Sequence, residues 1–403
     1  MCFNSYLVIT DVLSQYRQDL HCHVNISYAF QNCLIHIFAG TSSPTGKFFG
    51  TCAVLSSHED TPAWASIFNF IRDSGIKPRY SMGDGAKAIS KAGKEAFGSF
   101  GNSRLMCWSH THRAIVPQLK SISTFNKSVS DKILKNIMDI QWSALNEGTF
   151  RKLFKLLEKK YVGMYDAVLN GLINKFFSYM HKVWIDSEEF MWYEGAHPWG
   201  VSNNQGNIRF FLLYHCMLIE YFKGVEGVNK EIKQSHTFRR RLDVGELIFV
   251  LTRLVEEWSE VDDKLLESPR LSLLEGEKTS LSLKTEGYQW FKKNQNKPDR
   301  IMKINPKGKY TVSESPEFLL GKVSNLWAVT TTSGLKSEKS LKERAKERMA
   351  NRSEPEVEDF DEYMKIRTSC WILEERDGDY YCDCPRGMKV CFLIICLLRF
   401  KLP

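Results

Sequence analysis

The alternation of strand-like and helix-like segments between residues 24 and 122 constrains the fold of this chain more than any other feature. Three β-branched and aromatic runs come first, separated by turn residues, at 24–30, 33–40 and 48–57. A helix, a strand, a helix, a strand and a helix are then predicted over 61–75, 77–85, 86–98, 103–112 and 113–122. An antiparallel meander followed by strands that alternate with helices predicts a mixed α/β sheet covered by helices.

The first predicted helix has clear boundaries. Thr61 can cap it, Pro62 suits the first helical position, and Gly75 ends it. Its apolar residues recur at helical spacing and predict one buried face: Trp64, Ile67, Phe68 and Ile71. The next helix is predicted to close at Gly98.

The rest of the chain is predicted to be mostly helical over 128–187 and again over 239–268. From about 269 to 359 the composition turns polar. Residues 335–363 are predicted to form a charged helix or a tether, and their mixed charges favour a solvated face.

Composition excludes some classes of protein. Eleven scattered cysteines do not form the regular framework of a secreted disulfide-rich domain, which favours a reducing compartment. The N-terminus lacks the basic and then apolar pattern of a signal peptide. The most apolar run, 208–222, contains Arg209, His215 and Glu220, which are costly in lipid, so no membrane segment is expected. A net charge of +8 permits nucleic-acid binding without requiring it.

Asp84 is the first candidate for chemistry. It lies between Gly83 and Gly85, after an apolar strand and before a helix. Acids at the carboxyl ends of strands face the place where ligands bind in α/β folds. The residues alone favour the alternative, an aspartate that forms a turn or caps the helix.

The surroundings of Asp84 resemble the Mutator-like (MULE) transposase domain. Residues 78–115, "PRYSMGDGAKAISKAGKEAFG…RLMCWSHTHRAI", match its strand ending in Asp, its A-x-A-I helix and its strand with C-x-x-H, here Cys107 and His110. Residues 192–204, "WYEGAHPWGVSNN", are similar to the family's WYEG…TNN segment. The resemblance covers roughly 24–260. The C-x-x-H pair could hold a metal, but local ordering of the core is the favoured interpretation.

This resemblance implies a ribonuclease-H-like fold with a DDE triad and phosphoryl transfer on DNA. Three carboxylates would hold two Mg²⁺ or Mn²⁺ ions, which stabilise the attacking and leaving oxygens. Asp84 matches the second acid. The first acid belongs to a D-x-T-Y/F pattern, where this chain has Asn25 in "NISY"; Asp11 lies about a strand too early. An amide offers only a neutral oxygen, so lower metal affinity is expected.

The third acid of the pattern TNN-x-x-E-x-x-N falls in an interrupted segment. Removing residues 207–225 joins "SNNQG" to "EGVNKE" and brings Glu226 to the matching place, with Asn229 on the same helix face. This favours an in-frame insert, most simply a retained intron. The alternative is a genuine buried helix, although its residues are apolar on all sides.

The C-terminal cysteines resemble a SWIM zinc finger, C-x-C-x(n)-C-x-H. Cys382, Cys384 and Cys391 match the three cysteines, but Leu393 stands where the histidine belongs. Structural Zn²⁺ needs four ligands. Cys396 could be the fourth ligand or a buried thiol. The pattern therefore predicts a finger cut off partway, with Zn²⁺ bound only if it is complete.

The leading hypothesis is a MULE-type transposase-derived protein that acts in the nucleus. Its expected partner is DNA, and a homo-oligomer is compatible with this hypothesis. Its ancestral DNA cleavage and strand transfer would be impaired by Asn25. The alternatives are a non-catalytic domesticated DNA-binding or transcription-regulating protein, and a fragmentary gene product. The predicted division begins with an unassigned segment (1–23), the first part of the core (24–127) and a helical insertion (128–200). The completed core (201–265), a linker (266–359) and a truncated finger (360–403) follow.

Overall fold

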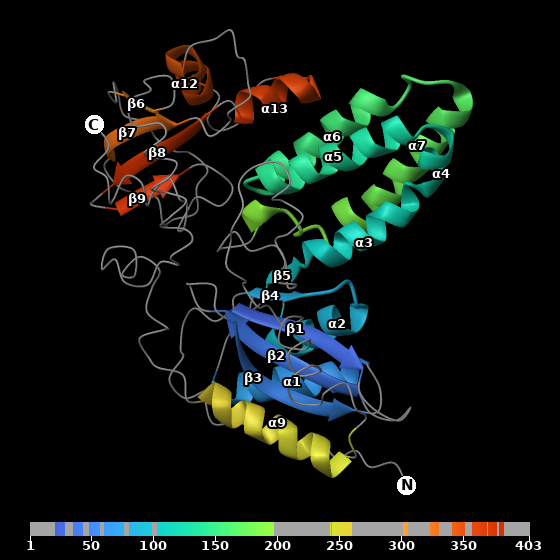
Figure 1. The fold of residues 1–403 in the computed structure, drawn as a ribbon, viewed down its shortest axis with the longest axis vertical. Helices are drawn as coiled ribbons and strands as arrows, with labels where there is room; N and C mark the ends of the chain where they lie inside the picture. Colours follow the sequence, from blue (N-terminus) through green and yellow to red (C-terminus); the bar gives the residue numbers. More distant parts are fainter. Residues whose placement is uncertain are drawn as a thin grey trace. The chain divides into compact units, whose positions relative to one another are not determined.

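A computed structural model places the chain in two compact units (Figure 1). The first unit contains residues 1–115, 186–192 and 202–268, and the second contains 116–185, 193–201 and 269–403. The residues that the structure describes are 21–28, 35–42, 48–56, 60–75, 80–98, 103–196, 242, 244–259, 301–304, 323–329, 341–350, 357–368, 370–376 and 379–382.

A five-stranded mixed sheet forms the first unit. Its strands are β1 (His21–Tyr28), β2 (Ile35–Ser42), β3 (Phe48–Ser56), β4 (Tyr80–Gly83) and β5 (Ser103–Met106). They lie in the order β3-β2-β1-β4-β5. The β1–β2 and β2–β3 pairs are antiparallel, whereas the β1–β4 and β4–β5 pairs are parallel. The predicted meander and mixed α/β sheet are thus confirmed, although β1 begins at His21 rather than Val24.

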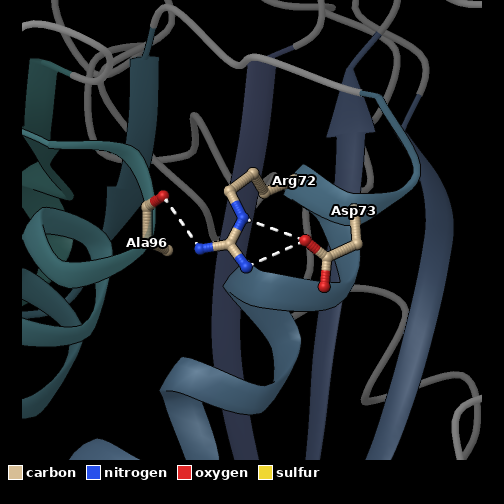
Figure 2. A network of polar contacts seen from close by, with 3 residues as sticks. All are labelled: Arg72, Asp73 and Ala96. Atoms are coloured by element: carbon tan, nitrogen blue, oxygen red, sulfur yellow. Dashed lines mark hydrogen bonds and ion pairs between the residues drawn. The ribbon is translucent and has the colours of Figure 1, made fainter.

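Three helices accompany this sheet: α1 (Thr61–Asp73), α2 (Lys87–Phe97) and α9 (Val244–Ser259). Helices α1 and α2 pack against each other, and α9 lies beside β3 (Figure 1). The predicted face of α1 is confirmed, since each of its four apolar residues is at most 1% exposed. At the end of α1, Arg72 donates to the Asp73 carboxylate and, at 3.5 Å, to the carbonyl of Ala96 on α2 (Figure 2).

The start of α1 differs from the prediction by one residue. Asp60 is the N-cap, and its Oδ1 accepts a hydrogen bond from the Ala63 N–H at 3.1 Å. Thr61 is therefore the first helical residue and Pro62 the second. Both Asp60 and Thr61 can cap, and proline is tolerated here because the first N–H groups of a helix have no partner within it. Gly98 ends α2 as predicted, with a φ of 72°.

The strand predicted over 103–112 is shorter than expected. It ends at Met106, and helix α3 (Trp108–Gln118) begins two residues later. The Cys107 carbonyl accepts hydrogen bonds from the N–H groups of His110 and Thr111, which closes the first helical turn. The C-x-x-H pair therefore lies at a strand-to-helix turn and not on a strand.

Helices dominate the chain between the parallel strands and the WYEG segment, as predicted. They are α4 (Lys120–Phe125), α5 (Lys127–Ser143), α6 (Glu147–Tyr161), α7 (Ala167–Met180), the π-helical η1 (His181–Ile185) and the 3₁₀ turn η2 (Glu194–Ala196). The side chains of Asn126, Asn146 and Asp166 cap α5, α6 and α7, respectively, by accepting from N–H groups of the first turn.

A second sheet belongs to the second unit. It is antiparallel, in the order β6 (Ile301–Ile304), β7 (Val323–Val329), β8 (Trp371–Arg376), β9 (Asp379–Cys382). Helices α12 (Leu341–Ala350) and α13 (Phe360–Thr368) accompany it. The predicted linker 266–359 thus contributes two strands and a helix. The charged helix predicted here is confirmed as α12, and Lys342, Glu343 and Lys346 form its solvated face. Its other face was not predicted: Leu341 and Ala345 pack in a core, and Arg344 and Arg348 are buried.

Candidate functional site

Asp84 lies directly after β4, at the carboxyl ends of the short parallel strands β4 and β5, whereas β1 continues to Tyr28. The chain runs outward from β1 through β2 and β3 and then returns to the other side of β1 as β4. The order of strands reverses between β1 and β4. In open α/β sheets, ligands bind outside the carboxyl ends of the strands at such a switch point. The part-exposed Asp84 is therefore well placed for a site.

The Asp84 carboxylate also has a local structural role. Its Oδ1 accepts a hydrogen bond from the Ala86 N–H at 3.0 Å, which makes a tight turn. Helix α2 starts at Lys87 with Ala86 as its N-cap and no side-chain cap. The alternative that the residues alone favoured, an aspartate that forms a turn or caps the helix, is thus confirmed in its turn form. One hydrogen bond to one oxygen leaves the carboxylate further acceptor capacity.

Arg104 on β5 is a residue of this site that the sequence did not reveal. Its guanidinium donates to the carbonyls of Leu105 at 3.0 Å and Ser81 at 3.5 Å, and also to the backbone carbonyl of Asp84. Burial lowers the pKa of the guanidinium to about 10, while the charges of Asp84 and Glu189 act in the opposite direction. Arg104 therefore remains charged at neutral pH, and its positive charge opposes the binding of a cation at Asp84.

The pairing of β1 with β4 can be extended toward positions 25 and 84. Strands β1 and β4 pair from His21 with Tyr80 to His23 with Met82. Continued by two residues, this parallel register sets position 25 level with position 84. On the other side, Gly83 pairs with Met106, and the Cys107 N–H donates to the Gly83 carbonyl at 3.0 Å. Extended beyond the paired residues of β1, β4 and β5, these registers align positions 25, 84 and 107 in one row.

The C-x-x-H pair has a clear backbone role. Cys107 is buried, and its carbonyl accepts from His110 N at 3.0 Å and from Thr111 N at 3.1 Å. Within the ranges that the structure describes, no group of three or more His, Cys, Asp or Glu residues could hold a metal ion. The contacts agree with the interpretation that this pair orders the core, and they do not test metal binding.

The WYEG segment is divided between the two units after Trp192, and the residues on each side contact residues of their own unit. In the first unit, the Met191 carbonyl accepts from Met106 N at 3.0 Å, and Trp192 stacks on Trp108 with ring centres 5.3 Å apart. In the second unit, Tyr193 stacks on Phe150 at 4.6 Å, and burial raises its pKa. The segment is therefore fixed by packing and backbone contacts.

Several predicted residues lie outside the described residues: Asp11, the segment 207–225, Glu226, Asn229, Cys384, Cys391 and Cys396. Cys382 is the last residue of β9. The third acid, the insert and the zinc finger therefore stay predictions.

No helix in the described ranges is both long and apolar enough to span a membrane. Comparison with known proteins yields no assignment, since no family model and no curated protein matches the chain. A functional proposal must therefore rest on the residues and their geometry.

Proposed function

We propose that this chain is a MULE-type transposase-derived protein with a ribonuclease-H-like core, whose ancestral activity is metal-dependent cleavage and strand transfer of DNA. The observation that carries the proposal is the parallel pairing of β1 with β4 at the switch point of the mixed sheet, whose register extends toward positions 25 and 84. These are the two positions that the resemblance assigns to the first and second acids. The proposal is supported by the parallel pairing of β1, which contains position 25, with β4, which directly precedes position 84.

The residues of this row do not by themselves suit a pair of divalent ions. Such ions need several carboxylates, whereas the row offers Asp84 and an amide at position 25. The guanidinium of Arg104 lies beside Asp84 and adds positive charge. Glu226 is the proposed further acid, but it lies outside the described residues. No cleavage step is therefore assigned to these residues, and the activity is proposed to be impaired.

A nicking assay on supercoiled DNA carrying element ends, with Mg²⁺ or Mn²⁺, tests this proposal. We expect little nicking by the natural chain and metal-dependent nicking by Asn25→Asp combined with deletion of 207–225. Adding Asp84→Asn should abolish that gain. Asn174→Asp, an exposed residue of α7, is the control for charge and should not produce nicking. If the restored variant does not nick DNA, the enzyme proposal fails.

A non-catalytic DNA-binding or transcription-regulating protein is the second candidate. It is favoured by Asn25, an uncharged residue where the resemblance expects an acid, and by Arg104, whose guanidinium adds positive charge beside Asp84. Salt-dependent DNA binding without nicking by any of these variants would support it. In both proposals the protein binds DNA and acts in the nucleus. Both are also compatible with self-association of the chain. Zn²⁺ remains the proposed ligand of Cys382, Cys384 and Cys391 if a fourth ligand completes the finger.

A further inference from the structure

Positive charge is concentrated in the helical residues of the second unit. Residues 116–185 contain eleven lysines and arginines against five acids, a net +6 of the chain's +8. On α6, lysines recur at a spacing of three and four residues and so share a face. This lysine row consists of Lys152, Lys155, Lys159 and the adjacent Lys160. Lys155 and Lys159 are exposed, and the other two are part-exposed.

An acidic segment of the same unit, residues 358–362, lies on the lysine row. Glu358 Oε2 is 2.6 Å from Lys159 Nζ, and Asp361 Oδ1 is 2.6 Å from Lys160 Nζ. The hydrogen bond from Lys159 lowers the pKa of Glu358, and the charges of Lys155 and Lys152 lower it further. The carboxylates of this segment therefore sit within the positive field of the whole row.

Apolar contacts beneath the ion pairs attach α13 to α6. Phe360 and Tyr363 are 2% and 1% exposed. The Nζ atoms of Lys160 and Lys152 lie 5.2 and 5.6 Å from the centres of these two rings, respectively. The ion pairs themselves face solvent, since the side chains of Lys159 and Glu358 are 62% and 87% exposed. An anion in solution can therefore reach Lys159 without displacement of α13.

We propose that the lysine row of α6 binds the phosphate backbone of duplex DNA, and that the acidic segment 358–362 occupies part of the row as an internal competitor. Carboxylate oxygens 2.6 Å from two ammonium groups stand where phosphate oxygens would be bound. Because the competitor belongs to the same chain, its effective concentration is high and it weakens binding. This contact is separate from the Asp84 site and does not depend on cleavage.

Binding of a fluorescent random-sequence duplex to the full chain, in EDTA and at several NaCl concentrations, tests the proposal. Glu358→Gln with Asp361→Asn removes both ion pairs and should tighten binding roughly three- to ten-fold. Asp73→Asn with Glu95→Gln is the matched control, because it removes the same charge from two exposed ion pairs on α1 and α2. The control should change affinity less than about two-fold, because Asp73 and Glu95 pair with Arg72 and Lys91 and these exposed pairs do not involve the lysine row.

A second pair of variants tests the specific contact. Lys159→Gln should weaken binding and reduce the salt slope by about 0.9, the loss of one phosphate contact. In that background Glu358→Gln should no longer tighten binding, because its partner is gone. Thermal unfolding of each variant checks that it folds. Because EDTA removes divalent ions, the result is independent of nicking.

Three results would overturn the proposal. The acid variants could bind no more tightly than the natural chain, or the matched control could tighten binding equally. Binding of phosphatidylserine vesicles in place of DNA would assign the lysine row to a different partner.

Discussion

Replacing Gly195 with alanine tests whether backbone packing fixes the WYEG segment. An added Cβ would lie 2.3 Å from the Leu145 carbonyl oxygen and 2.4 Å from that of Ala144. Both obstacles are backbone atoms, so no side-chain rotation relieves the overlap. Overpacking lowers the free energy of unfolding by about 1–3 kcal/mol. If the backbone at residue 195 moves away from residues 144 and 145 to relieve the overlap, the hydrogen bond from Gly195 N to Ala144 O is lost, which costs about 1 kcal/mol more. The expected loss in the free energy of unfolding is therefore about 2–4 kcal/mol.

Thermal unfolding followed by circular dichroism measures this loss. At about 2–4 °C per kcal/mol, the midpoint of the second unit should fall by roughly 4–16 °C. Gly171→Ala on α7 is the matched control, because a Cβ there has nothing within 4 Å. Alanine is the better helix former, so this control should keep or raise the midpoint. A Gly195→Ala midpoint equal to that of the natural chain would refute the packing argument.

Two further predictions concern the helices of the second unit. Burial raises the pKa of Tyr161 from 10.0 to about 12, so its contribution to stability is complete below about pH 10 and is lost as the pH rises toward 12. Tyr161→Phe should flatten this loss in urea unfolding at several alkaline pH values, and an unchanged slope would contradict the assignment. Asp166→Ala removes the cap that accepts from Val168 N and Leu169 N and should cost about 1 kcal/mol. The exposed Asp131→Ala should cost less than about 0.5 kcal/mol in the same assay, and equal losses would show that the cap contributes nothing.

Local periodicity predicted the face of α1 because a helix places every third and fourth residue on one side. Trp64, Ile67, Phe68 and Ile71 are buried for that reason. The cap could not be located to the residue, since Asp60 and Thr61 are neighbours of equal capping ability. The position of Asp84 after a strand was also predictable, because the acid follows an apolar run and precedes a helix.

Contacts between distant parts of the chain were not predictable. Arg104 reaches the carbonyls of Ser81 and Asp84 through strand pairing, and no local pattern marks it. The pairing of Trp108 with Trp192 depends on the return of residues 186–192 to β5. The mixed charges of α12 predicted its solvated face but not the burial of Arg344 and Arg348. The spacing of Leu341 and Ala345 was the available sign of a buried face.

Helix α9 is translated long after β3, the strand that it lies beside. During synthesis the sheet can therefore form before α9 is present. Strand β3 is at the edge of the five-stranded sheet, and its neighbour α9 begins at Val244. After Met106 leaves the ribosome, about 140 more residues precede α9. At about 5–20 residues per second, this is a delay of roughly 7–28 s during which β3 lacks α9. Nascent chains stalled before Val244 should therefore aggregate more readily, or bind chaperones longer, than chains stalled after Ser259.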